Sequence, residues 1–216
     1  MCQIMIRVAI SVEGYTEDEF TKLILVPYFR TKDIELTSVV VTTKRIKSGL
    51  KYKGGSINVK RIKNEVEKLL PNFDYVTTFY DYYGFQNKGS LSVELLEKKI
   101  FNLFNNKKFI PYVQKYEFET LLFSDPNYYC EHFDTIRAQK DIEKIIKCFS
   151  NIEEINNSKD TSPAKRITDL FNNYNENYDK FVDGPMIIKE IGLNKVMNRC
   201  NRFNKWIKTI SNLSNI

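Results

Sequence analysis

Short apolar runs alternate with amphipathic stretches along the first half of the chain. Four runs are rich in β-branched and aromatic residues, as strands are: residues 7–12, 35–43, 75–80 and 108–114. Three stretches with helical spacing separate them: residues 16–29, 57–70 and 91–104. This alternation predicts an α/β fold with a mostly parallel four-stranded sheet flanked by helices. Pro27 predicts an early end or a kink in the first helix, and Pro111 favours an edge strand or a bulge.

The second half of the chain carries helical patterns and few strand patterns. Amphipathic stretches predict helices at residues 136–149, 164–174 and 194–213. Pro126 predicts the end of a short helix, and Gly184-Pro185 predicts a break. We therefore expect an α/β core at residues 1–126 and a helical C-terminal region at residues 127–216, packed together as one compact unit.

The positive charge of the chain is concentrated in one segment. Lys and Arg number 33 against 27 Asp and Glu, a net charge of +6. The span from residue 44 to residue 63 contains no acid and eight cations: Lys44, Arg45, Lys47, Lys51, Lys53, Lys60, Arg61 and Lys63. Such a patch attracts phosphate polymers, so these residues are predicted to bind nucleic acid. The alternative is a solvated glycine-containing loop and helix without a partner.

Cysteine, histidine and apolar residues exclude several classes of protein. The four cysteines have no zinc-site spacing, and His132 is the single histidine, so a site built from several His ligands is excluded. No apolar run approaches the roughly 20 residues of a membrane span. We expect a cytoplasmic protein with reduced thiols, no contact with a membrane, and His132 at the surface.

Acidic residues follow three of the predicted strands. Glu13 comes after the first, Asp81 after the third, and Glu117 just after the fourth. The carboxyl ends of parallel strands meet at one edge of a sheet, which predicts that these carboxylates gather there. With Glu17 and Glu119 they suffice for one or two Mg²⁺ or Mn²⁺ ions, which favour oxygen ligands and can activate water against a phosphodiester. The alternatives are a helix-start acid at Glu17, a turn residue at Asp81, and surface acids at Glu117 and Glu119.

The segment VEGYTEDEF resembles the start of the Toprim catalytic domain, which topoisomerases, primases and the overcoming-lysogenisation-defect (OLD) nucleases share. In that motif a strand ends in Glu, followed by Gly and by a second Glu four residues on, as Glu13 and Glu17 are here. Over nearly its whole length the chain is similar to the Toprim-like bacterial family of unknown function numbered 4276. The segments that carry this likeness are VEGYTEDEF, Gly54-Gly55, TTFYDYYGF, KFIPYVQKYEFETLLFSDP, SPAKR and GLNKVMNRCNRFNKWI.

The resemblance implies a Toprim-like fold and a metal-dependent nuclease of DNA or RNA, tRNA included. Glu13 would be a metal ligand or general base, Asp81 would stand for the DxD motif, and Lys165 would lie near the scissile phosphate. Asp81-Tyr82-Tyr83 lacks the second Asp of that motif, and Tyr116 stands where the family usually has a His.

The resemblance also implies a partner and a context. Members of such families are often encoded beside an ABC-type or AAA-type ATPase in phage defence. This chain has no GxxxxGK[ST] motif of its own, so it is not expected to hydrolyse ATP by a P-loop. The alternative function is a non-catalytic Toprim-like regulatory or sensor subunit of such an ATPase complex, which the missing Asp favours. The oligomeric state stays open.

Overall fold

The chain folds into a mixed α/β structure with a mostly parallel sheet and a helical C-terminal part, as predicted. The computed structural model describes residues 5–45, 51–53, 57–156 and 158–215, with the backbone alone for 42–45, 51–53, 159 and 215. It divides into two compact units: Met1–Gln114 with Thr209–Ile216, and Lys115–Lys208. The boundary expected at residue 126 lies within the second unit.

The first unit is built on a parallel sheet with strand order β2-β1-β5-β6, and β7 also pairs with β5. Its strands are β1 (Ile6–Val12), β2 (Ile34–Val40), β5 (Tyr75–Asp81), β6 (Phe109–Ile110) and β7 (Val113–Gln114). Pro111 lies between β6 and β7 on the edge of the sheet, because it has no N–H to donate to the ladder. The prediction for this proline is confirmed.

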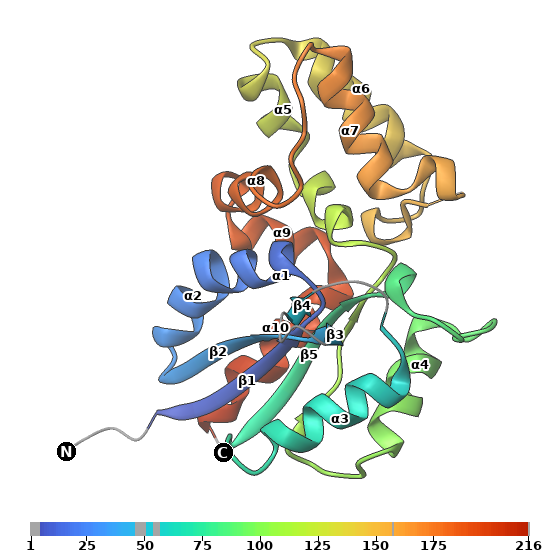
Figure 1. Ribbon diagram of the computed structural model, residues 1–216. Coiled ribbons are helices and arrows are strands. Elements are labelled where there is room, and N and C mark those ends of the chain that lie inside the picture. Colours follow the sequence, from blue (N-terminus) through green and yellow to red (C-terminus); the bar gives the residue numbers. More distant parts are fainter. Residues whose placement is uncertain (1–4, 46–50, 54–56, 157, 216) are drawn as a thin grey trace. The chain divides into compact units, whose positions relative to one another are not determined.

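Helices cover both faces of this sheet (Figure 1). On one face, α3 (Val59–Leu69) and α4 (Val93–Asn102) form a buried cluster with Ala9, Val76 and Tyr80. On the other face run α1 (Tyr15–Phe20), the π-helix η1 (Thr21–Leu25) and α2 (Val26–Arg30), and the ring of Phe20 lies 5.7 Å from that of Phe79. The two central strands, β1 and β5, are buried on both faces and therefore read as nearly continuous apolar runs in the sequence, whereas β2 alternates buried and exposed residues at its start.

The helix that contains Pro27 continues to Arg30. A π-helical stretch, Thr21–Leu25, comes immediately before α2, which holds the proline. A proline inside a helix removes one hydrogen bond from the α-helical ladder, and wider π turns absorb such interruptions. The early end considered for this helix is wrong, and the sequence alone does not distinguish the two outcomes.

The basic segment contains two short strands that pair antiparallel. Its strands are β3 (Thr42–Arg45) and β4 (Lys51–Lys53), with Arg45 opposite Lys51. The sequence predicts a glycine-containing loop in this segment, whereas Thr42–Arg45 and Lys51–Lys53 form strands.

The second unit is helical. Its elements are the 3₁₀ helices η3 (Phe118–Ser124), η4 (Ile152–Glu154) and η5 (Lys159–Thr161), and the α-helices α5 (Pro126–His132), α6 (Ile136–Lys147), α7 (Pro163–Asn173), α8 (Asp183–Ile191) and α9 (Leu193–Arg199). The last helix, α10 (Asn201–Ser211), belongs to this unit up to Lys208 and to the first unit from Thr209. Every residue of η3 is buried, and α7, α8 and α9 all contact it. The first unit further contains the 3₁₀ helices η2 (Tyr82–Gly84) and η6 (Asn212–Asn215).

The short helix predicted before Pro126 is η3, which ends at Ser124, and Pro126 then begins α5. Two other boundaries in the second half differ from the prediction. Gly184-Pro185 lies in the first turn of α8 instead of breaking the chain. Both prolines are tolerated there because the first N–H groups of a helix have no partner within it. The final predicted helix is two helices, because the backbone of Cys200 is extended between α9 and α10.

Candidate active site

Glu13 and Asp81 come to the same edge of the sheet from neighbouring strands. Val12, the last residue of β1, is in register with Phe79 of β5. Glu13 therefore follows the end of one parallel strand, and Asp81 closes the strand beside it. This is the edge at which α/β sheets bind ligands.

The carboxylate of Glu13 lies against Gly84. A Cβ at position 84 would lie 2.8 Å from Cδ of Glu13 and 2.5 Å from its Oε1, so only a glycine leaves room for the carboxylate as it stands. The carbonyl of Gly84 accepts the N–H of Ile57 at 3.0 Å, and the N–H of Gln86 donates to the carbonyl of Ile57 at 2.8 Å. The loop after β5 is thus fixed on both sides of its contact with Glu13.

Strand alternation distinguishes the positions of the two carboxylates. Tyr80 faces α3 and α4, and its hydroxyl donates to Oγ of Ser11 at 2.6 Å. Burial, and to a smaller extent the charges of Glu65 and Glu13, raises the pKa of Tyr80. Successive side chains of a strand point to opposite faces of the sheet. Glu13, two residues after Ser11, therefore lies on the face of Tyr80, and Asp81, the residue after Tyr80, lies on the opposite face. An ion that contacted both carboxylates would therefore have to lie beyond the strand ends.

Glu17 caps the first helix, as the alternative interpretation of the sequence has it. Its Oε2 accepts the N–H of Gly14 at 2.9 Å, and the residue is buried. A carboxylate at this position is also stabilised by the positive end of the helix dipole. One carboxylate oxygen of Glu17 is therefore bonded within the fold, to the residue that follows Glu13 in the chain.

A lysine that the sequence analysis missed lies in the same loop as Gly84. Nζ of Lys88 is 4.6 Å from the ring centre of Tyr82 and 5.9 Å from that of Tyr83, and it donates to the carbonyl of Phe85 at 3.2 Å. Burial lowers the pKa of Lys88. Among the described residues, Lys88 has no acidic partner within ion-pair distance. Two consecutive tyrosines after Asp81, followed by a lysine, are the sequence signal that points to it.

The other predicted site residues belong to the helical unit, where each has a partner. Oε2 of Glu117 accepts the N–H of Ala164 at 2.9 Å, in the first turn of α7. Glu119 is buried, and Oε1 accepts the hydroxyl of Tyr178 at 3.4 Å. The exposed Lys165 binds Oδ1 of Asp169 at 2.5 Å. These contacts give all three residues roles within their own unit.

Few side chains at the carboxyl edge of the sheet could bind a metal ion. In the described parts of the chain, no three His, Cys, Asp or Glu side chains form a group that could hold a metal ion. The carboxylates of Glu13 and Asp81 remain, and Mg²⁺ needs only one or two protein carboxylates because it keeps several waters. The carboxylate of Glu13 is packed against Gly84, which restricts its position as a metal ligand requires. The side chains at this edge of the sheet are therefore compatible with a Mg²⁺ or Mn²⁺ ion.

The predicted nucleic-acid-binding residues are distributed over three elements. Lys44 and Arg45 lie in β3 and Lys51 and Lys53 in β4, whereas Lys47 lies outside the described residues. On α3, Lys60 and Arg61 lie in the first turn, and Lys63 is 3.8 Å from Glu67. Their binding of nucleic acid stays a prediction.

His132 is exposed at the end of α5, as predicted, where Nε2 lies 3.0 Å from Oε2 of Glu176. No helix in the part of the chain that the structure describes is long and apolar enough to cross a membrane.

Comparison with known proteins places the chain in a family. No curated protein and no solved structure matches it significantly. The model of one family, described as a domain of unknown function (DUF4276), matches residues 12–211. This match includes the carboxyl edge of the sheet with Glu13, Asp81 and Gly84, and it extends through α10. The chain therefore belongs to the DUF4276 family.

Proposed function

We propose that this protein is a metal-dependent nuclease with a Toprim-like site. The observation that carries the proposal is that Glu13 follows one parallel strand and Asp81 closes the strand beside it, at one edge of the sheet, with the carboxylate of Glu13 packed against Gly84. The glutamate–glycine sequence after the first strand supports the Toprim relationship. Two oxygen-rich side chains at such an edge are suited to Mg²⁺ or Mn²⁺ and poorly suited to Zn²⁺.

Each residue of the edge has a defined part in this proposal. Glu13 and Asp81 would hold the ion, which supplies a water of lowered pKa and charge stabilisation at the phosphodiester. Glu17 positions the start of α1 through the N–H of Gly14. The cation of Lys88, held over Tyr82, binds a substrate phosphate beside Gly84, and the role expected of Lys165 near the scissile phosphate stays a prediction.

The proposal also covers substrate, partner and location. The basic residues of β3, β4 and α3 hold the backbone of DNA or RNA, tRNA included, by contacts to phosphates. The protein acts in the cytoplasm as an effector of anti-phage defence, together with an ABC-type or AAA-type ATPase. This part rests on the resemblance of the motifs.

Cleavage assays with matched variants test the proposal. The full chain, with and without the ATPase encoded beside it, is incubated with labelled DNA, RNA or tRNA in Mg²⁺ or Mn²⁺. We expect cleavage that EDTA stops, and that Glu13→Gln or Asp81→Asn lowers by at least roughly 10- to 100-fold. Glu67→Gln, an exposed acid on α3, is the control and keeps full activity.

A second outcome would favour the alternative function. If the chain binds the ATPase but cuts no substrate with either metal, and if Glu13→Gln leaves that binding unchanged, the nuclease proposal is wrong. The protein is then a non-catalytic regulatory or sensor subunit of the ATPase complex. Binding measured by co-purification distinguishes this result from a misfolded preparation.

A further inference from the structure

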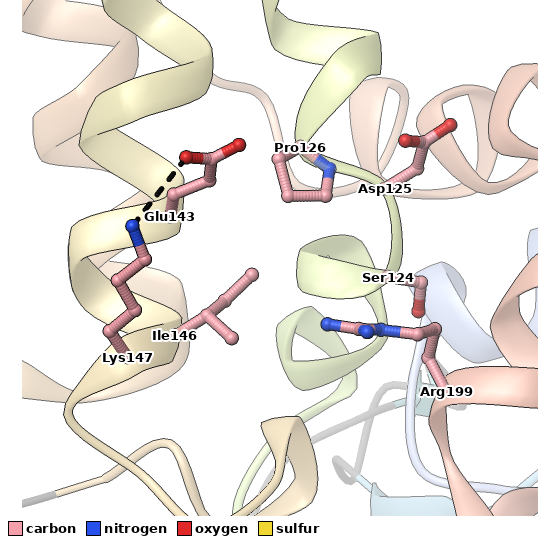
Figure 2. Close-up of a pocket in the computed structure, with 7 residues that line it drawn as sticks. All are labelled: Ser124, Asp125, Pro126, Glu143, Ile146, Lys147 and Arg199. Carbon is pink, nitrogen blue, oxygen red and sulfur yellow. Dashed lines mark ion pairs between the residues drawn. The ribbon is translucent and has the colours of Figure 1, made fainter.

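A pocket of about 420 Å³ opens on the helical unit, outside the proposed nuclease site (Figure 2). Its walls are the segment Ser124–Pro126, one side of α6 and the last residue of α9. This volume lies in the range of roughly 300–1,000 Å³ that small-molecule sites have. The pocket is therefore large enough for an organic ligand.

The acids that line the pocket already have partners. Oδ2 of Asp125 lies 2.5 Å from Nζ of Lys195, and Oδ1 accepts the N–H of Asn127. Glu143 accepts a hydrogen bond from Gln139 and lies 3.9 Å from Nζ of Lys147, the pair that Figure 2 marks with a dashed line. The negative charges of the lining are thus balanced within the protein.

Arg199 differs from these residues. Its guanidinium extends from the end of α9 into the pocket, toward Ile146 (Figure 2). Within the described part of the chain, Arg199 makes no ion pair. A guanidinium presents a planar set of donors that matches two oxygens of a phosphate or carboxylate. The pocket therefore carries one uncompensated positive charge that an anionic ligand would neutralise.

The remaining lining indicates which kind of anion fits. Pro126 and Ile146 supply apolar surface around the guanidinium, and the carboxylate of Glu143 is an acceptor for ligand donors. Ile146 and Arg199 also line an adjoining hollow of about 220 Å³, to which Asn151 and Asn198 contribute amides. An inorganic ion would leave these groups unused, whereas a nucleotide has an anionic phosphate, a flat apolar base and hydrogen-bonding groups.

We propose that this pocket binds a nucleotide, with the phosphate on Arg199, the base against Pro126 and Ile146, and Glu143 accepting a hydrogen bond from base or sugar. The ligand is either a free mononucleotide or the terminal nucleotide of a strand. The proposal is independent of the nuclease function, because no residue of the sheet edge takes part in it.

Calorimetric titration of the full chain tests the proposal with three probes. These are adenosine monophosphate, inorganic phosphate and a single-stranded hexanucleotide. We expect saturable binding of the mononucleotide, tighter than that of inorganic phosphate. Arg199→Gln weakens it about tenfold or more, because a charge-assisted bidentate contact is lost. Arg137→Gln, an exposed arginine on α6 outside the pocket, changes it by less than about twofold.

A further variant checks the pocket itself. Ile146→Glu places a negative charge beside Arg199 and abolishes binding, while circular dichroism shows that the half-buried position leaves the fold intact. Tighter binding of the hexanucleotide than of the mononucleotide assigns the site to a strand terminus, and the reverse assigns it to a free nucleotide. The proposal is overturned if no probe binds saturably, if succinate binds as well as the mononucleotide, or if both arginine variants behave alike.

Discussion

The carboxylate of Glu13 and the backbone of Gly84 are in van der Waals contact, in a space that any larger residue at position 84 would enter. Glu13 follows β1 and Gly84 ends η2, directly after β5, and the bond from the N–H of Ile57 to the carbonyl of Gly84 holds the glycine in place. The position of the candidate catalytic acid therefore depends on a residue that has no side chain.

Replacing this glycine is expected to damage activity more than stability. Gly84 does not have a positive φ, so alanine suits its backbone, and the group it would displace is the end of a flexible side chain. For Gly84→Ala we expect a loss of stability below about 1 kcal/mol. A shift of the carboxylate by about 1 Å can cost about 100-fold in rate. Thermal melting and cleavage assays measure the two effects.

The matched variant for this experiment is Gly89→Ala. Gly89 has a φ of 58°, and no neighbouring atom lies within 4 Å of the place that a Cβ would take, so alanine there is strained but displaces nothing. It should cost about 1 kcal/mol of stability and leave the cleavage rate per folded molecule unchanged. Full activity in Gly84→Ala would show that the contact with Glu13 has no part in catalysis.

Lys88→Gln should weaken substrate binding without unfolding the protein. Because burial lowers the pKa of Lys88, its charged form is less favourable in the folded chain than in the unfolded chain at neutral pH. That penalty is full below the folded pKa, and it falls to zero as the pH rises from the folded pKa to the higher unfolded pKa. Removing the charge at pH 7 relieves it and partly offsets the lost contact with Tyr82, which is worth about 0.5–1 kcal/mol.

The measurement for Lys88 is the salt dependence of nucleic-acid affinity. A lysine that contacts one phosphate contributes about one to the slope of log affinity against log salt concentration. We expect Lys88→Gln to lower that slope by about one, whereas Lys98→Gln, an exposed lysine on α4, leaves it unchanged. Equal slopes for the two variants would remove Lys88 from the binding surface.

The order of elements in the first unit could be predicted because a strand buried on both faces of a sheet appears in the sequence as a short apolar run. Residues 8–12 and 75–80 contain no charged side chain and are mostly apolar, as strands covered on both sides are. The rule that ligands bind at the carboxyl edge then led to Glu13 and Asp81. Both predictions rest on local pattern and topology, which one sequence contains.

The features that the sequence does not show depend on tertiary contacts. A proline breaks a helix or lies in its first turn according to where that turn begins, and packing decides this, as Pro185 illustrates. The bond from the N–H of Ala164 to Oε2 of Glu117 joins residues 47 positions apart, and metal binding by Glu117 stays a prediction. The contact between Glu13 and Gly84 likewise joins residues far apart in the chain, and no local sequence pattern predicts it.

Asp141 should make the stability of the helical unit depend on acid pH. Its carboxylate accepts Nζ of Lys144 at 2.9 Å and the hydroxyl of Tyr174 at 3.0 Å, and these contacts, the lysine first, hold its pKa below the usual value. A lowered folded pKa contributes stability above the unfolded pKa of about 3.9, and this stability is lost as the pH falls through the folded value.

Unfolding of Asp141→Asn at several pH values checks this expectation. At pH 7 the variant should be less stable by about 0.2–1 kcal/mol, the range of exposed ion pairs. The difference should shrink below about pH 4, where the wild-type carboxylate also becomes protonated. The exposed Asp160→Asn serves as the control. A difference that stays constant down to about pH 2 would show that the charge of Asp141 contributes nothing to stability.

Two variants of Glu117 separate a structural role from metal binding. Glu117→Ala removes the acceptor for the N–H of Ala164 and should cost about 0.5–2 kcal/mol, as other lost helix caps do. Glu117→Gln keeps an amide oxygen for that N–H and should cost less. Because the amide is a poor ligand for Mg²⁺, it would still abolish any metal binding through Glu117. We expect the rise in melting temperature with Mn²⁺ to persist in Glu117→Gln and to vanish in Glu13→Gln. Loss of the metal response in both variants would show that Glu117 is a metal ligand.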